Sequence, residues 1–392
     1  MISIEAAIGS IKTHVRPLLK KKVKSIEKAG GYRLYNNVKS PINMPPFRQS
    51  AMDGYAVNLH DSPNYILVDE IKAGDTHNPY LKKGEAVRIF TGAAVPDTAN
   101  AIVMQEKVVV NGKSITVSDV PLPEHNIRPV GEQVTAGDIA LKANTLLTPA
   151  AIGFLLSLGI REVTVFKKPN IAIVTTGNEL VDAGKPLSYG KIYESNSKML
   201  LSALYSLKFY DVTLYKVNDD YTHTLQTLST AIEHNDLVLV TGGISVGDYD
   251  FVGKALAALG TEQQFYNVNQ KPGKPLFYGI HKATQVFALP GNPAAALTCF
   301  YVYVYIALQN MMGRDSLELP KIKAKCLNRF EKKGDRPQFL KACYHNGTVK
   351  ILDGQNSSML HTFALANALV VVPIDVSHIE INDYVETILL PH

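Results

Sequence analysis

The sequence predicts a multidomain α/β protein in which a doubly wound α/β domain is joined to additional β-rich domains. From about residue 171, short apolar runs alternate with longer helical patterns, which is typical of a parallel sheet with crossover helices. After Pro320, β-type runs follow one another without long helices between them. The length of 392 residues also exceeds that of one domain, at about 100 to 200 residues per domain.

The amino-terminal part is predicted to be a helical and linking domain that is interrupted by a β-rich insertion. A helical opening is expected to stop at the glycine pair of residues 30–31. Runs rich in β-branched residues and broken by Pro, Gly and Asn follow, before TPAAIGFLLSLG returns to a helical pattern. We expect the linking domain over residues 1–45 and 125–167, and the β-rich insertion over residues 46–124.

The α/β domain is expected over residues 168–316, followed by a barrel-like β domain over residues 317–392. The runs IAIVT, VTLYKV, DLVLVT and VFAL predict strands of the α/β domain. One intervening helix begins at the capping candidates Ser195 and Asn196, and another ends on Gly260. In the last part, KIKAKCL, QFLKACY, TVKILD, ALVVVPI and YVETILL predict strands.

Composition narrows the class of protein. The three cysteines form no CxxC pair, which argues against a zinc knuckle or a disulfide framework, and the amino terminus lacks the pattern of a signal peptide. We therefore expect a cytoplasmic protein. The net charge of +5, with only short basic runs and no nucleic-acid-binding signature, favours a small anionic substrate over nucleic acid.

One uncharged segment, residues 294–312, approaches the length that spans a bilayer. Its Thr298, Gln309 and Asn310, its three tyrosines and the LPGNP turn before it favour a helix buried within a domain or between subunits. We expect no membrane span.

Four loops are expected to meet at the carboxyl ends of the strands, where open α/β sheets bind their ligands. They are TTGNEL (175–180), NDD (218–220), TGGISVGDYD (241–250) and LPGNP (289–293). Their carboxylates, hydroxyls and glycines suit a divalent cation and a phosphate together. Simpler roles stay open: Asp219 or Asp220, and likewise Asp248, could cap a helix, and Glu179 could interact with a helix dipole.

Two further stretches carry candidate residues. KPGKP places Lys271 and Lys274 on either side of a Pro-Gly turn, which suits an anion, although an exposed basic hairpin is the simpler alternative. PPFRQSAMDGYAV places Asp53 before Gly54, where the pair is expected to make a sharp turn that aims the carboxylate outward. No Walker A, GxGxxG or HExxH motif is present and the eleven histidines show no ligand spacing, so ATP hydrolysis, dinucleotide binding and histidine catalysis are disfavoured.

The ordered set of motifs resembles the molybdopterin molybdenumtransferases of the MoeA type, also seen as the E domain of gephyrin. The set comprises PPFRQSAMDGYAV, RIFTGAAVP with AIVMQEKV, TTGNEL with GKIYESN, TGGISVGDYDFV, KPGKP, ALPGNPAAAL and ANALVVVP. The resemblance implies insertion of molybdate into adenylylated molybdopterin with magnesium-dependent release of AMP. It also implies an elongated homodimer, in which residues 1–45 and 125–167 help dimerisation and SAMDGYA of one subunit faces the α/β domain of the other. A molybdopterin adenylyltransferase would be the upstream partner.

The resemblance also assigns roles to residues. The acids that it implies for catalysis are Asp53, Glu179, Asp219 and Asp250, of which the last three would hold Mg²⁺. The residues expected to bind substrate are Thr91, Arg128, Thr176, Gly177, Gly242, Gly243, Ser245, Lys271, Lys274, Pro290, Gly291, Asn292, Pro293 and Ser357.

Three positions depart from the usual family pattern. Gln133 stands where an Asp is usual, Asn267 where a lysine is common, and Lys341 where an arginine is usual. Two alternative functions remain at this point. One is a non-catalytic dimeric binding module of the gephyrin E-domain type, and the other is a molybdopterin adenylyltransferase, whose family usually has a single short domain.

Overall fold

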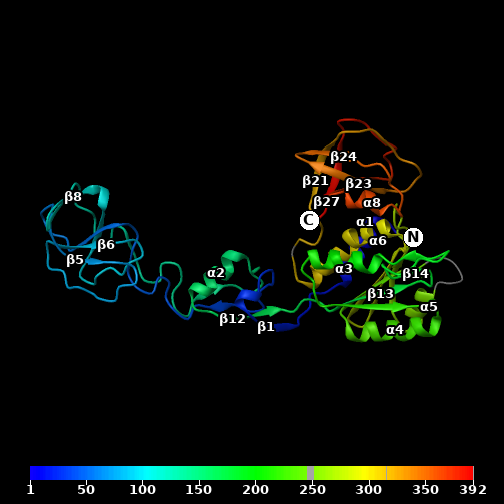
Figure 1. The fold of residues 1–392 in the computed structure, drawn as a ribbon, viewed down its shortest axis with the longest axis horizontal. Coiled ribbons are helices and arrows are strands. Elements are labelled where there is room, and N and C mark those ends of the chain that lie inside the picture. The colour runs from blue at the N-terminus through cyan, green and yellow to red at the C-terminus, as the bar shows by residue number, and fades with distance from the viewer. Residues whose placement is uncertain (245–250, 315, 392) are drawn as a thin grey trace. The chain divides into compact units, whose positions relative to one another are not determined.

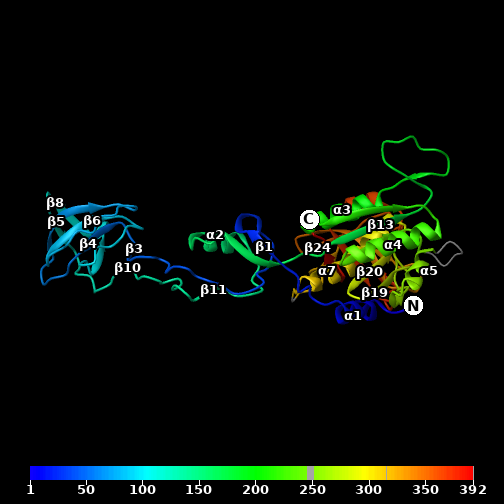
Figure 2. The ribbon, with the colours of Figure 1, turned by 90° about the horizontal axis from the view of Figure 1, so that it is seen from below.

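The computed structural model describes residues 1–244, 251–314 and 316–391, and residues 245–250, 315 and 392 lie outside the described part. The chain forms two compact units. The first combines Met1–Lys20 with Lys167–His392, and the second is Lys21–Phe166 (Figure 1 and Figure 2). The predicted fold class, α/β with additional β-rich domains and a barrel-like carboxy-terminal part, is confirmed.

A six-stranded sheet forms the centre of the first unit. Four strands run parallel and two more extend the sheet in antiparallel fashion, which the sequence reading did not foresee. The neighbouring inner strands β13 and β17 are buried along their whole length, and their near-continuous apolar runs reflect burial on both faces. In sheet order the strands are β16 (Val212–Val217), β13 (Ile171–Thr176), β17 (Leu237–Thr241), β20 (Thr284–Leu289), β19 (Phe277–His281) and β18 (Glu262–Tyr266).

Helices cover both faces of this sheet, because alternate side chains of each strand point to opposite sides. Ile171 and Ile173 pack in one apolar cluster with α3 and α1, whereas Ala172 and Val174 pack in another with α4 and α5. Figure 1 shows α3 and α4 on opposite sides of β13. The helices are α1 (Ile4–His14), α3 (Asn196–Ser206), α4 (Tyr221–His234) and α5 (Phe251–Ala258).

The uncharged segment is a continuous helical stretch, Pro293–Met311, made of α6 (Pro293–Cys299), a π-helical turn (Phe300–Val304) and α7 (Tyr305–Met311). By length and composition it could cross a membrane, but 83% of its apolar window is buried inside the protein. Its side chains belong to the same cluster as the sheet face that α3 covers. This matches the expectation of a buried core helix.

The carboxy-terminal residues form a closed five-stranded barrel. Phe339, Leu369 and Ile388 of the barrel belong to the same apolar cluster as α1 and α7, so the barrel and the α/β part share a core. In order around the barrel the strands are β21 (Lys321–Cys326), β24 (Thr348–Ile351), β23 (Gln338–His345), β25 (Ala368–Val372) and β27 (Tyr384–Leu389). Beside it lie the pair β22 (Phe330–Glu331) and β26 (His378–Ile379), and α8 (Leu360–Ala364).

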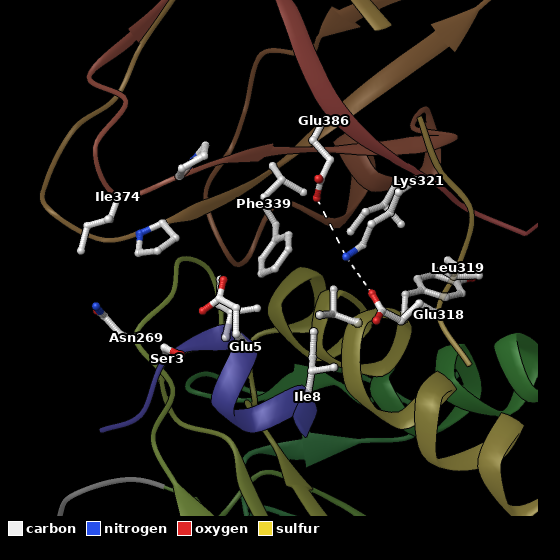
Figure 3. A pocket seen from close by; sticks show the side chains of 17 residues that line it. Ser3, Glu5, Ile8, Asn269, Glu318, Leu319, Lys321, Phe339, Ile374 and Glu386 are labelled. Carbon is white, nitrogen blue, oxygen red and sulfur yellow. Dashed lines mark ion pairs between the residues drawn. The ribbon is translucent and has the colours of Figure 1, made fainter. Parts of the chain in front are cut away.

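A pocket of about 400 Å³ lies where the barrel meets α1 and the long helical stretch (Figure 3). Its walls are mainly apolar, and Phe339 and Ile8 face each other across it. At its rim, the ammonium of Lys321 lies 2.7 Å from a carboxylate oxygen of Glu318 and 3.9 Å from one of Glu386. These ion pairs fix the segment that leads into the barrel.

The second unit contains a six-stranded sheet and three short strand pairs. The sheet has the order β7 (Ala101–Met104), β4 (Gly54–Val57), β6 (Glu85–Ile89), β5 (Asn64–Ile71), β9 (Ser114–Val117) and β8 (Val108–Asn111). The pairs are β1 (Lys21–Ser25) with β12 (Glu162–Phe166), β2 (Val38–Lys39) with β11 (Ile139–Leu141), and β3 (Gln49–Ser50) with β10 (Ile127–Arg128). Helix α2 (Pro149–Ser157) begins at Thr148, whose hydroxyl accepts a hydrogen bond from the Ala151 N–H at 3.2 Å.

The prediction that the helical opening continues to Gly30 is wrong. Helix α1 ends at His14, and residues 21–25 form strand β1. The last helical turn precedes Pro17, and a residue before proline is restricted to extended conformations. Residues 21–25, which overlap the basic run of residues 20–24, pair with β12. This tertiary contact overrides the local helix propensity.

Candidate active site

A cavity of about 640 Å³ opens at the carboxyl ends of the parallel strands. Three of the four predicted loops contribute to its wall, namely those after β13, β17 and β20. The start of α3, Pro275 of the basic loop and Ser358 complete the lining. Of the predicted residues, those that line it are Thr176, Glu179, Gly242, Pro290, Gly291, Asn292 and Pro293.

Three buried polar atoms of this cavity have no hydrogen-bond partner among the described residues. They are the hydroxyl oxygens of Thr175 and Thr176 and the amide oxygen of Asn196. Buried polar groups in native proteins are almost always paired, so an unpaired group in a cavity wall indicates a ligand or ordered water. The amide nitrogen of Asn196, in contrast, donates to the hydroxyl of Thr241 at 2.9 Å and to the carbonyl of Gly291 at 2.7 Å.

Gly242 of the cavity wall is required by close approach of the chain. A Cβ on Gly242 would lie 2.4 Å from the carbonyl oxygen of Thr176, and its φ of +86° is one that glycine adopts without strain. Gly177 also has a positive φ, +141°, and a Cβ there would lie 2.6 Å from the side-chain carboxylate of Glu179. A Cβ on Gly243 would lie 2.6 Å from the hydroxyl of Thr176. At Gly242, therefore, the loop after β17 packs against the backbone at the end of β13.

The carboxylates of the NDD loop have separate roles. Asp220 is the N-cap of α4, because its carboxylate accepts a hydrogen bond from the His223 N–H at 2.8 Å. Asp219 instead pairs with Asn178: the Asn178 N–H donates to Oδ2 of Asp219 at 3.1 Å, and the Asp219 N–H donates to the Asn178 amide oxygen at 3.0 Å. This reciprocal pair ties the Asp219 loop to the loop that carries Glu179.

The predicted metal set is only partly visible. Asp250, together with Ser245 and Asp248, lies outside the described residues. Among residues 1–244, 251–314 and 316–391, no cluster of three or more His, Cys, Asp or Glu side chains has metal-binding geometry. Glu179 is exposed, and Oδ1 of Asp219 makes no hydrogen bond to a described residue. Two carboxylates with unused oxygens thus stand on adjoining loops.

The basic loop borders the same cavity through Pro275. Both Lys271 and Lys274 are exposed, and neither forms an ion pair with a described carboxylate. The Lys271 N–H donates to the carbonyl of Pro337, and the carbonyl of Lys271 accepts from the Phe339 N–H, both at 2.9 Å. The backbone of the loop is therefore attached to the segment that enters the barrel.

Ser357 connects the barrel to the last loop of the cavity. Its carbonyl accepts hydrogen bonds from the N–H groups of Ala294 at 3.1 Å and Ala295 at 3.3 Å, and its hydroxyl accepts from the Asn292 amide at 2.9 Å. The neighbouring Ser358, which the sequence reading did not single out, lines the cavity itself.

The remaining predicted residues belong to the second unit. Asp53 is exposed, and one of its carboxylate oxygens accepts hydrogen bonds from both the N–H and the hydroxyl of Thr91 at 2.7 Å. These bonds to the Thr91 backbone and side chain hold the pKa of Asp53 below its usual value. Arg128 lies in β10 with an exposed side chain. The contact between Asp53 and Thr91 is a finding of the structure, and the roles predicted for the two residues stay predictions.

The prediction that Asp53 and Gly54 together make a sharp turn is wrong for Gly54, and a close strand contact explains why residue 54 is glycine. Gly54 does not have a positive φ and is the first residue of strand β4. A Cβ at this position would lie 1.9 Å from the carbonyl oxygen of Val103, so the glycine is required by close strand packing. The orientation of Asp53 is set by Thr91 instead.

Comparisons with known proteins decide the family. Three family models match in chain order: the MoeA N-terminal region (domain I and II) over residues 2–159, a probable molybdopterin binding domain over residues 172–310, and the MoeA C-terminal region (domain IV) over residues 323–390. The molybdopterin molybdenumtransferase of Haemophilus influenzae is 33% identical over 358 residues, which cover 89% of this chain and 88% of the relative. The chain belongs to the MoeA-type molybdopterin molybdenumtransferase family.

Other comparisons agree with this membership. The molybdopterin molybdenumtransferase of Staphylococcus aureus strain MRSA252 is 32% identical over 362 residues, covering 89% of this chain and 86% of the relative. The crystal structure of the molybdopterin biosynthesis MoeA protein from Pyrococcus horikoshii OT3 matches with a TM-score of 0.83 at 27% identity, covering 99% of this chain and all of that chain. Such end-to-end similarity argues against a single-domain adenylyltransferase, and the curated relatives are named as transferases rather than as binding modules.

The role of Asn196 in the cavity was not predicted from the sequence. Asn196 was interpreted as a possible helix cap, but the carboxylate of Glu194 caps α3 by accepting from the Ser197 N–H at 2.8 Å and its hydroxyl at 2.6 Å. Ser195 makes no capping hydrogen bond through its side chain. The available signal in the sequence was Glu194, an acid three residues before Ser197, because this spacing suits a side-chain cap. With Glu194 as the cap, the Asn196 side chain is left to bridge the loops.

The departures from the family pattern have different surroundings. Lys341 is 3% exposed, and its ammonium donates to the carbonyls of Gly354 at 2.7 Å, Met359 at 3.0 Å and Asn356 at 3.2 Å. Desolvation by burial lowers the pKa of Lys341. Asn267 has a positive φ of 68°, which asparagine tolerates better than most residues. Gln133 is exposed in the second unit, and its N–H donates to the carbonyl of Met44 at 2.9 Å.

Proposed function

We propose that the protein transfers molybdenum from molybdate to molybdopterin, which it accepts in adenylylated form and from which AMP is released with the help of Mg²⁺. The observation that carries this proposal is the set of polar atoms of Thr175, Thr176 and Asn196 in the cavity at the strand ends, which have no hydrogen-bond partner in the described part of the chain. A planar heterocycle with alternating donors and acceptors can pair with all three, because a hydroxyl both donates and accepts while the asparagine oxygen accepts.

The rest of the cavity suits the phosphate groups of such a substrate. Gly242 and Gly291 leave the backbone bare at the cavity wall. The exposed lysines 271 and 274 supply positive charge on a loop that reaches the cavity through Pro275. Together the backbone and the lysines would bind the two phosphates that the phosphoanhydride bond joins. The lysines would also favour departure of the negatively charged AMP.

Carboxylate oxygens are the ligands that Mg²⁺ prefers, and the donor set here fits that preference. Glu179 and Asp219 would hold the ion from adjoining loops, with Asp250 as the third ligand implied by the family resemblance. Bound Mg²⁺ would offset phosphate charge and polarise a phosphoryl oxygen. Asn178 keeps the carboxylate of Asp219 oriented through the reciprocal hydrogen bonds described above.

The test is turnover with the purified full-length protein. Incubation with molybdopterin-AMP, molybdate and Mg²⁺ should release AMP and yield a cofactor that activates an apo-molybdoenzyme. Chelation of Mg²⁺ should abolish AMP release. Correctly folded protein that releases no AMP would contradict the proposal, and ATP-dependent adenylylation of molybdopterin would point to the adenylyltransferase instead.

Neighbouring aspartates provide a matched pair of variants. Asp219→Asn removes a charge from the proposed metal site, and kcat/KM should fall by about 100-fold, as for residues that hold or orient metal ligands. Asp220→Asn changes the same chemistry one residue later, but asparagine caps helices about as well as aspartate, so kcat/KM should stay within a factor of about two. Equal effects of the two changes would contradict the metal role of Asp219.

We propose further that the protein acts as a homodimer in which Asp53 of one copy serves the cavity of the other. The support is the family membership and the exposed, Thr91-ordered carboxylate of Asp53. Co-expression of Asp53→Asn and Asp219→Asn chains tests it. With two-fold symmetry, half of the dimers are hybrids with one intact site, so about a quarter of wild-type activity should return. Activity no higher than that of either variant alone would contradict a shared site.

The chemistry of the substrate also places the protein after another enzyme. An adenylyltransferase acting on molybdopterin must supply it, because the phosphoanhydride bond has to be formed before it is cleaved. A cytoplasmic location remains a prediction, which the cysteine pattern supports.

A further inference from the structure

We propose that Gln270 is a positioning residue that holds Lys271 and Lys274 as a preformed clamp for the substrate's phosphates. This inference rests on the proposed function, because it assumes that the two lysines contact the substrate. Gln270 directly precedes the basic loop, and its side chain is fully buried beneath it.

Both ends of the Gln270 amide are hydrogen-bonded. Its nitrogen donates to the carbonyl of Gly273 at 3.0 Å and lies 3.5 Å from the sulfur of Cys299. Its oxygen accepts from the hydroxyl of Tyr303. Cys299 and Tyr303 are themselves fully buried and stand one turn apart, at and within the π-helical turn of the long core helix. The amide therefore links the middle of the loop to the rigid core of the unit.

The loop fits tightly onto this support. Gly273, midway between the two lysines, has a positive φ of 84°. A Cβ at Gly273 would lie 2.6 Å from the sulfur of Cys299 and 3.0 Å from the amide nitrogen of Gln270. Burial raises the pKa of the Cys299 thiol to about 12, so the thiol is neutral and acts as a packing surface at neutral pH.

The backbone on either side of Gly273 is held as well. Lys271 is hydrogen-bonded through both its N–H and its carbonyl to the segment that enters the barrel, and the carbonyl of Lys274 accepts from the Val268 N–H at 2.9 Å. The guanidinium of Arg336 donates to the carbonyl of Gln270 at 3.1 Å. The loop is thus fixed from three directions, while both ammonium groups remain exposed.

This arrangement has a functional consequence. Two like charges on one short loop repel each other, and an unsupported loop would separate them in the absence of an anion. A loop that is already ordered loses no further conformational freedom when the substrate binds. Removing the hydrogen bonds that order the loop should therefore lower mainly the affinity for the substrate. A fully satisfied buried polar network also specifies one arrangement more strictly than an apolar contact of the same volume.

The experiment compares steady-state AMP release in four proteins: wild type, Gln270→Met, the Lys271→Ala/Lys274→Ala double variant, and the triple variant. Methionine fills a similar volume without the amide. Gln270→Met should raise KM for molybdopterin-AMP about tenfold, a change equal to one decade in affinity, with kcat changed less than about twofold. In the triple variant it should add less than about twofold to KM, because interacting sites are not additive.

A second variant and a matched control separate positioning from general destabilisation. Tyr303→Phe removes only the hydroxyl that donates to Gln270, and it should raise KM in the same direction by about threefold. Tyr278→Phe removes an equivalent buried bond, from the Tyr278 hydroxyl to the Gln285 amide oxygen at 2.7 Å, elsewhere in the sheet. Tyr278→Phe should lower the unfolding midpoint without changing KM.

Each outcome decides the inference. If Gln270→Met or Tyr303→Phe raises KM as strongly without the two lysines as with them, or if Tyr278→Phe raises KM equally, Gln270 is not a positioning residue. If loss of the two lysines leaves KM unchanged while AMP is still released, the proposed phosphate contact itself is wrong. Should no AMP be released, the dissociation constant of inorganic pyrophosphate in the same variants makes the comparison without turnover, and equal affinities would overturn the inference.

Discussion

The cavity wall and the supports beneath it use buried polar groups in opposite ways. In the wall, Thr175, Thr176 and Asn196 carry polar atoms without a described partner. In the supports, the amide of Gln270 and the ammonium of Lys341 donate to backbone carbonyls of the loops they hold, and the Gln270 amide also accepts from Tyr303 of the core helix. Unpaired groups are thus available to a ligand, whereas paired groups fix the loops that surround it.

The largest effect is expected where the wall has no room for a side chain. Gly242→Ala would place a Cβ 2.4 Å from the Thr176 carbonyl at a positive φ, so the loop must shift. We expect a loss of unfolding free energy of about 3 kcal/mol from overpacking and backbone strain, with AMP release falling by at least about 100-fold.

Gly260→Ala is the control for this change. Gly260 also has a positive φ, +75°, but nothing lies within 4 Å of the added Cβ. Its cost should be limited to about 1 kcal/mol from the left-handed conformation, with normal AMP release. Chemical denaturation and AMP assays measure both, and equal losses would show that the wall is not the constraint.

Removing the Lys341 ammonium should lower stability less than Gly242→Ala does. Its effect should be confined to the loop that carries Ser357. Lys341→Met removes the donor that Gly354, Asn356 and Met359 share and leaves only the Asn356 carbonyl with another described donor, the Met359 N–H, so it should cost about 2 kcal/mol. Because Ser357 lies on the supported loop and accepts from Ala294 and Ala295, hydrogen exchange at those two amides should accelerate. Lys350→Met, on the exposed side of neighbouring β24, should change neither exchange nor stability, and accelerated exchange there would contradict a specific role for Lys341.

Removing an unpaired group should leave stability intact and weaken binding. Thr176→Val deletes a buried hydroxyl that has no described partner, so the unfolding free energy should stay constant or rise. KM for molybdopterin-AMP should rise about fivefold, corresponding to one neutral hydrogen bond. Thr298→Val removes a hydroxyl that donates to the Ala294 carbonyl at 2.8 Å, and it should show the reverse pattern. Identical behaviour of the two valines would remove the distinction between wall and support.

The smallest effect concerns the exposed Asp53–Thr91 pair. Its hydrogen bonds lower the pKa of Asp53, so they favour folding above the unfolded-state pKa of about 3.9. That contribution is lost as pH falls through the lower, folded-state value. In Thr91→Val one of the two donors is gone, and an NMR titration should show the Asp53 pKa moving up toward its usual value. An unchanged titration would mean that the backbone N–H of Thr91 alone orients the carboxylate.

Much of the architecture follows from local patterns. The apolar runs of the α/β domain became strands, and their following loops met at one cavity because parallel strands end at the same edge. Two antiparallel strands, β18 and β19, and the strand at residues 21–25 were missed. Residues 21–25, KKVKS, are mostly lysine and contain one apolar residue, so they lack the alternation typical of a strand. Only their pairing with β12 identifies them as one.

The family, most of the element order and the loops that carry glycines and carboxylates could be predicted from the amino-acid sequence, because each motif depends on residues close together in the chain. The folded structure was needed to find that Asp220 caps a helix while Asp219 pairs with Asn178, 41 residues away. It also decided that Gln270 meets Tyr303, 33 residues away, beneath the basic loop. Hydrogen-bond partners at such separations are chosen by packing, which local propensity does not encode.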